Sequence, residues 1–171
     1  MKNKNQTSPV DKAKSIIGEL TPLKGHDCGQ LCSAACCKGD EQTGMLLFPG
    51  ESTALPTIEL PDGGRLAVCS GRCDRSQRPL ACMLFPFFPT VDDRDRVYAE
   101  IDARACGVCP LAAHSDEVIF DRAFLRAVRA AGKQLACDEE CLEFMRAITA
   151  QIDELNEIRD SILADTAGKA E

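Results

Sequence analysis

Residues 78–88 read Arg-Pro-Leu-Ala-Cys-Met-Leu-Phe-Pro-Phe-Phe, so a single cysteine lies between two prolines in an apolar segment. Proline suits the first turn of a helix, where its missing N–H leaves no bond unmade, and a proline further along ends the helix. We therefore predict a short helix that starts at Pro79 and ends before Pro86. The two prolines would hold Cys82 on a backbone that has little freedom to adapt.

Further cysteines gather on both sides of this segment in tight groups. Thiolate is the form of cysteine that binds metals, and close spacing in the chain brings several thiolates together at a small cost in entropy. A single cysteine is more simply a small buried apolar residue, but nine in this pattern indicate a metal centre. The candidate ligands are Cys28, Cys32, Cys36, Cys37, Cys69, Cys73, Cys82, Cys106 and Cys109.

The first group has a spacing of four residues, which in a helix places side chains on one face. We expect Cys28, Cys32 and Cys36 to line up in this way. Cys37 would join them only if the chain turns at the Cys36-Cys37 pair, and Lys-Gly-Asp at 38–40 favours a turn there.

Two kinds of metal centre fit a set of clustered thiolates. Tetrahedral zinc has Zn–S bonds of about 2.3 Å, which keeps the sulfurs less than about 4 Å apart. An iron–sulfur cluster such as [4Fe–4S] is also bound by four cysteines but holds them further apart. The spacing in the sequence fits both, so we predict zinc or an iron–sulfur cluster.

Several other residues could belong to the site or to the structure around it. Cys137 and Cys141 flank a helix start, and they are either ligands or part of the core. His26 and His114 lie near cysteine groups, as ligands or as ordinary surface residues. Arg78 would place positive charge beside an anionic centre, or would be solvated or paired with a carboxylate.

The composition indicates the cellular compartment of the protein and the classes of partner that it can bind. The 171 residues include 11 cysteines and carry a net charge of −7, and no apolar run follows the polar N-terminus as in a secretory signal. An odd number of thiols in a chain this long favours a reducing, cytoplasmic compartment over a disulfide scaffold. The acidic charge, a single Tyr98 and the lack of a 20-residue apolar run argue against nucleic-acid and membrane partners.

Short strands and helices surround the cysteines, and the fold class that they predict is α+β. Asp-Gly at 62–63 predicts a hairpin, and a charged turn at 92–96 predicts another. A helix over 11–20 should turn Ile16, Ile17 and Leu20 inward. Strands are expected at 45–48, 57–60, 65–68, 89–91 and 97–101, and the last two helices at 121–135 and 139–164. The parts are a tail with a short helix (1–20), an irregular metal-stapled domain with short β-hairpins (21–115) and a C-terminal helical segment (116–171).

The last predicted helix would be roughly 40 Å long, more than a small domain can cover. Its apolar stripe is Met145, Ile148, Ile152, Leu155 and Ile162, with Arg159 at the one position that breaks it. This is the spacing of a coiled-coil seam, so we expect a homodimer or a protein partner there. Alternatively, the helix at 121–135 folds back and covers the first half of the stripe.

The cysteine-rich segment resembles the YkgJ-type cysteine-cluster family, whose pattern is Cys-x2-Cys-x2-Cys-Cys followed by Arg-Pro-x2-Cys-Arg-x-Phe-Pro-Phe. Cys28 and Cys32 match with each gap one residue longer, and Met83 replaces the second arginine. The direct matches are Cys36, Cys37, Arg78, Pro79, Cys82, Phe85, Pro86 and Phe87.

The resemblance covers about residues 28–110, roughly half of the chain. It implies a zinc- or iron-chelating domain, or one with an iron–sulfur cluster, in a cytoplasmic bacterial protein. The family includes flagellin lysine N-methylases, so a small protein-modifying or redox enzyme is one alternative function. A zinc-stapled interaction module that presents its last helix to a partner is another.

Overall fold

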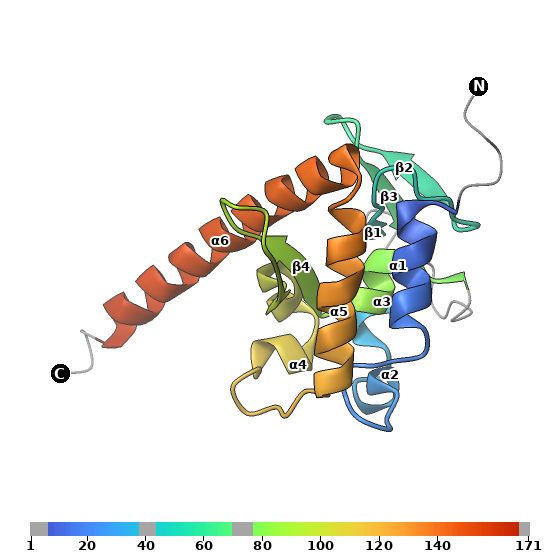
Figure 1. The fold of residues 1–171 in the computed structure, drawn as a ribbon. Coiled ribbons are helices and arrows are strands. Elements are labelled where there is room, and N and C mark those ends of the chain that lie inside the picture. The colour runs from blue at the N-terminus through green and yellow to red at the C-terminus, as the bar shows by residue number, and fades with distance from the viewer. Residues whose placement is uncertain (1–6, 38–43, 70–76, 168–171) are drawn as a thin grey trace.

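The computed structural model describes residues 7–37, 44–69 and 77–167, and it is a mixed α and β fold (Figure 1). The predicted α+β class is therefore confirmed. Along the chain the elements are α1 (Pro9–Ile17), α2 (Cys28–Leu31), η1 (Ala35–Cys37), β1 (Gly44–Leu46), β2 (Thr57–Glu59), β3 (Arg65–Val68), α3 (Leu80–Leu84), β4 (Phe87–Val91), β5 (Val97–Ile101), η3 (Ala103–Gly107), α4 (Pro110–Ala113), α5 (Arg122–Leu135) and α6 (Glu139–Ala167).

Strand β4 lies at the centre of the core, with α5 and α6 both packed against it. Successive side chains of a strand point to opposite faces, and β4 uses both. Phe87 makes an edge contact with Phe124 of α5, at 6.0 Å between ring centroids, while Phe88 lies 6.5 Å from Phe144 of α6. All five residues of β4 are consequently buried.

Two antiparallel sheets are present in the described residues. The predicted hairpin at 92–96 joins β4 to β5, and the predicted hairpin at 62–63 joins β2 to β3. Strand β1 pairs with the other edge of β3, giving the order β1-β3-β2. Gly44 allows this pairing, because a Cβ at that position would lie less than 2.5 Å from the carbonyl oxygen of Ala67.

Helix α1 packs against α5 and contributes to the same hydrophobic cluster. Its buried residues are Val10, Ala13 and Ile17, a spacing of three and four that matches one helix face. The expectation that Ile16 faces inward is wrong: it lies outside that face and is 37% exposed. Residues from all three predicted parts of the chain meet in this one cluster.

The first half of α6 is buried by β4 and η3. The idea that the preceding helix folds back over it is wrong, because α6 leaves the end of α5 at an angle and its far half projects beyond the body (Figure 1). Met145, Ile148 and Ile152 lie in the core. Among the described helices, none combines the length and apolar character that crossing a membrane requires.

Candidate functional site

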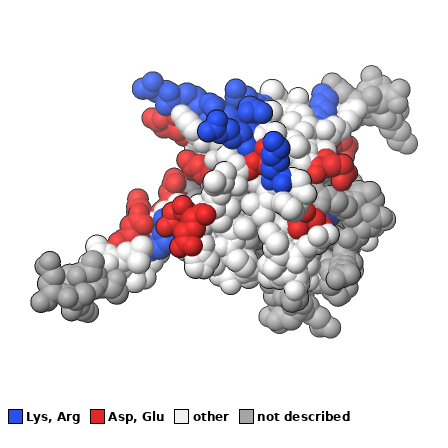
Figure 2. Space-filling view, turned by 90° about the horizontal axis from the view of Figure 1, so that it is seen from below, with Lys and Arg blue, Asp and Glu red and all other residues white. Residues whose placement is uncertain are grey.

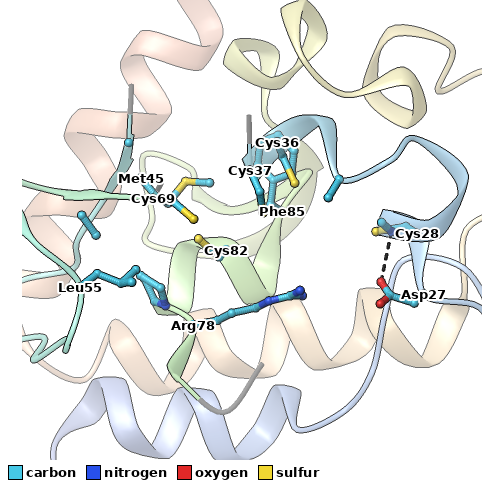
Figure 3. Close-up of a pocket in the computed structure, with 15 residues that line it drawn as sticks. Asp27, Cys28, Cys36, Cys37, Met45, Leu55, Cys69, Arg78, Cys82 and Phe85 are labelled. Carbon is cyan, nitrogen blue, oxygen red and sulfur yellow. Dashed lines mark hydrogen bonds between the residues drawn. The ribbon is translucent and has the colours of Figure 1, made fainter. Parts of the chain in front are cut away.

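Five of the nine predicted ligands line one cavity of about 90 Å³. They come from four segments: α2, η1, the residue after β3, and α3. We call it the thiol cavity, and Figure 3 shows Cys69 and Cys82 close to each other and Cys28 apart from them. The thiols that line it are those of Cys28, Cys36, Cys37, Cys69 and Cys82.

The first cysteine group lies on a tight reversal of the chain instead of on one helix face. Helix α2 begins at Cys28, where the Asp27 carboxylate accepts a hydrogen bond from the N–H of Gly29 at 3.1 Å. It stops at Cys32, so the expected alignment of three cysteines along one helix is wrong.

Two left-handed residues make this reversal, Ser33 at φ 51° and Ala34 at φ 55°. Neither is glycine, so the turn carries backbone strain. It leads directly into η1, where Cys36 and Cys37 both border the thiol cavity. The chain thus turns before the Cys36-Cys37 pair.

Cys82 lies on α3, the short helix predicted between two prolines. Pro79 is the residue that precedes its first turn, and Phe85 ends it next to Pro86. A buried carboxylate, Glu51, accepts the N–H of Leu80 at 2.7 Å and so caps the start of this helix. The helix places the half-buried thiol of Cys82 in the wall of the cavity.

The third cysteine group lies near the first one. Cys106 lies in η3, and Cys109 precedes α4 and is buried. Burial is the main reason why the pKa of Cys109 is raised, and the thiolate charges of Cys32 and Cys106 raise it further. These three thiols are therefore close enough to act on one another, although they do not line the thiol cavity itself.

Some of the charges around Cys28 raise the pKa of its thiol, and another lowers it. Burial is the largest cause of its raised pKa, and the charges of Asp27, Cys32 and Cys109 add to it. The guanidinium of Arg78 lowers the same pKa. Arg78 borders the thiol cavity, so one of its two predicted roles, positive charge beside the cysteines, agrees with its position.

The pKa of Cys36 is also raised, first by burial and then by the charges of Cys28, Cys32 and Cys109, while a hydrogen bond with Cys37 lowers it. Burial without a compensating charge keeps such thiols protonated. A bound cation reverses this effect, because a coordinating thiol loses its proton. The cavity thus brings together groups that a metal would convert into ligands.

Other residues named from the sequence lie elsewhere. Cys73 falls outside the described residues. His26 and His114 are exposed and do not border the thiol cavity. Cys141 is 1% exposed in the hydrophobic core, with its thiol 3.9 Å from the carbonyl oxygen of Pro49, and Cys137 is exposed on the surface.

Two acidic residues at the site were not singled out from the sequence. The sequence could have indicated a role for Asp27, because Asp before a short helical segment is a common N-cap. It could not have indicated the role of Glu51, since that role depends on contacts with distant parts of the chain. Met45 also borders the cavity, from β1.

Within the three described ranges, no group of three or more His, Cys, Asp or Glu side chains is already arranged to hold a metal ion. Comparison of the chain with protein-family models, with curated proteins and with solved structures found no match.

Proposed function

We propose that this chain binds a thiolate-coordinated metal centre, an iron–sulfur cluster in the first place, with zinc as the alternative. The observation that carries the proposal is the convergence of five thiols, from four separate segments, on one cavity. Soft thiolate ligands select zinc and iron–sulfur clusters over the hard cations that prefer oxygen. A centre of this kind belongs in a reducing compartment such as the cytoplasm, where thiols stay free.

We place the cluster first because Cys28 lies apart from Cys69 and Cys82 (Figure 3). Zinc needs its four sulfurs within about 4 Å of one another, whereas an iron–sulfur cluster fills a space between cysteines that are further apart. Apolar side chains such as Leu55 and Phe85 form much of the remaining cavity wall. Apolar surroundings reduce the solvent exposure of a cluster, which is one of the factors that set its potential.

The ligands that we assign to this centre come from the thiol cavity. Four are needed from Cys28, Cys36, Cys37, Cys69 and Cys82. Three further thiols lie beside this set, those of Cys32, Cys106 and Cys109. They could supply an additional ligand or bind a second metal centre. The positive charge of Arg78 would offset part of the negative charge of four thiolates.

The test is metal analysis of protein purified without oxygen, together with its visible spectrum. An iron–sulfur cluster predicts iron and acid-labile sulfide in equal amounts and absorption near roughly 400 nm. Zinc without such absorption would support the alternative. A fully reduced, folded protein that contains neither metal would refute the proposal. Cys137→Ser is the matched control, because this exposed thiol lies outside the cavity and its loss should leave the metal content unchanged.

A further inference from the structure

The far half of α6 carries apolar side chains that are exposed in the part of the chain that the structure describes. Leu155, Ile158, Ile162 and Leu163 are 40%, 50%, 58% and 59% exposed. They belong to α6 (Glu139–Ala167), whose far half projects beyond the body (Figure 1). A continuous apolar patch of this kind marks an interaction surface.

This surface continues a seam that the body covers in the first half of the helix. Met145, Ile148 and Ile152 alternate by three and four residues, as positions a and d of a heptad do, and they are buried. The same alternation continues through Leu155, Arg159 and Ile162. Ile158 and Leu163 fall at the flanking g and e positions and widen the apolar face.

The acidic residues of this segment lie away from the seam. Asp153, Glu154, Glu157 and Asp160 occupy positions b, c, f and b, which form the outer face of a paired helix. In Figure 2 the projecting part of α6 shows mostly acidic side chains, while Lys and Arg gather on another part of the surface. Two copies of the helix can therefore join their apolar faces without bringing these carboxylates together.

Arg159 determines the direction of such a pair. In a parallel pair its a position would face the same position of the other copy, so two arginines would repel each other in the seam. In an antiparallel pair, an a position packs against a d position. Arg159 would then lie beside an apolar residue, and the two arginines would occupy separate layers of the seam.

We infer that a second copy of this chain docks on residues 155–163 of α6, antiparallel and related by a two-fold axis. The apolar face has four exposed side chains per copy, which is at the small end for specific interfaces, so the affinity should be in the micromolar range. This inference is independent of the metal centre, because it uses no cysteine.

Sedimentation of the full chain between about 2 and 200 µM, a range that brackets a micromolar Kd, tests the pairing. The expected average mass rises from one chain to two. Ile158→Glu with Ile162→Glu should weaken association at least about 10-fold, the effect of roughly 1.4 kcal/mol. Glu157→Gln, on the outer face, should leave it unchanged. Circular dichroism should show the same helix content in all three proteins, because the changed residues are exposed.

Orientation is tested by a photo-crosslinking residue at position 155 and mass spectrometry of the joined peptides. Because position 155 is a d position, antiparallel pairing predicts links to the segment around Arg159, an a position, of the other copy. A link from position 155 to position 155 would overturn the antiparallel arrangement. A monomeric wild type at the highest concentration, or a double variant that still dimerises as the wild type does, would overturn the docking surface.

Discussion

The Nζ of Lys14 lies 2.8 Å from Oε1 of Glu51, a carboxylate that is only 2% exposed. The same carboxylate accepts the N–H of Leu80 at 2.7 Å and the N–H of Phe48 at 3.1 Å. It thus connects α1, the segment after β1 and the helix that carries Cys82. One buried anion therefore positions a wall of the thiol cavity.

Replacing Glu51 should destabilise the fold strongly. Glu51→Ala leaves two buried N–H groups without their acceptor, at about 1–3 kcal/mol each, so we expect a loss of roughly 2–6 kcal/mol. Glu51→Gln keeps an oxygen acceptor, so its free energy of unfolding should fall by less than that of Glu51→Ala. Urea unfolding measures both, and Glu59→Ala in the exposed strand β2 is the control. Equal unfolding midpoints for Glu51→Ala and the wild type would contradict this role.

At Gly132, α5 lies very close to the β4–β5 hairpin. A Cβ there would lie 2.5 Å from Cβ of Pro89 and 2.6 Å from Cγ1 of Val97. Alanine normally stabilises a helix by about 1 kcal/mol over glycine, but here the overlap should reverse the sign and cost about 1–3 kcal/mol. Thermal unfolding of Gly132→Ala tests this.

The control for Gly132 is Gly107→Ala in η3, where a Cβ would meet nothing within 4 Å. That variant should unfold within about 0.5 kcal/mol of the wild type, as substitutions away from special features do. A Gly132→Ala protein that is as stable as this control would show that α5 shifts to make room.

Local signals explain which elements could be predicted from the sequence. Asp62 lies in the β2–β3 turn, where its carboxylate accepts the N–H of Gly64 at 2.9 Å. Asp121 accepts the N–H of Ala123 at the start of α5, and Asp138 accepts that of Cys141 at the start of α6. Such turns and caps depend on neighbours a few residues away, and the sequence shows those directly.

The path of the first cysteine group could not be predicted, because its reversal uses left-handed Ser33 and Ala34. Side chains other than glycine rarely adopt this conformation, so no residue type signals it. The cavity depends on long-range pairing as well. Met45 lies opposite Ala67 in the β1–β3 ladder, which brings the end of β3 and Cys69 to the other cysteines. A local pattern holds no information about such a pairing.

Stability should fall at high pH because of Cys141. Burial, with Asp138 next, raises the pKa of this thiol from 9.0 to about 12. The folded protein therefore keeps a proton that the unfolded chain loses above pH 9, so unfolding becomes more favourable as pH rises from 9 toward 12. The expected loss is about 1–2 kcal/mol between pH 9 and 11.

The measurement is the free energy of unfolding of the wild type and of Cys141→Val across this pH range. Both proteins keep the other buried thiols, so the difference between them isolates Cys141. The variant should show a flatter decline than the wild type above pH 9. Parallel declines would show that Cys141 ionises as readily in the folded chain as in the unfolded one.

The final prediction separates a ligand from a core cysteine by the same chemical change at two positions. Cys82 borders the thiol cavity on a helix fixed by Pro79 and capped by Glu51, while Cys141 packs in the core. A serine hydroxyl is a poor ligand for metals that prefer thiolate. Cys82→Ser should therefore lose most of the bound metal. Cys141→Ser should be less stable than the wild type but should keep its metal.

Metal content per folded chain is the readout, because it does not depend on how much protein each variant yields. Removal of the metal should also lower the unfolding temperature of the wild type, since ligand binding to the folded state adds to its stability. Cys82→Ser should already show this lowered value, with little further change on chelation. If the two serine variants contain the same amount of metal per folded chain, Cys82 is not a ligand, whatever the stabilities of the variants.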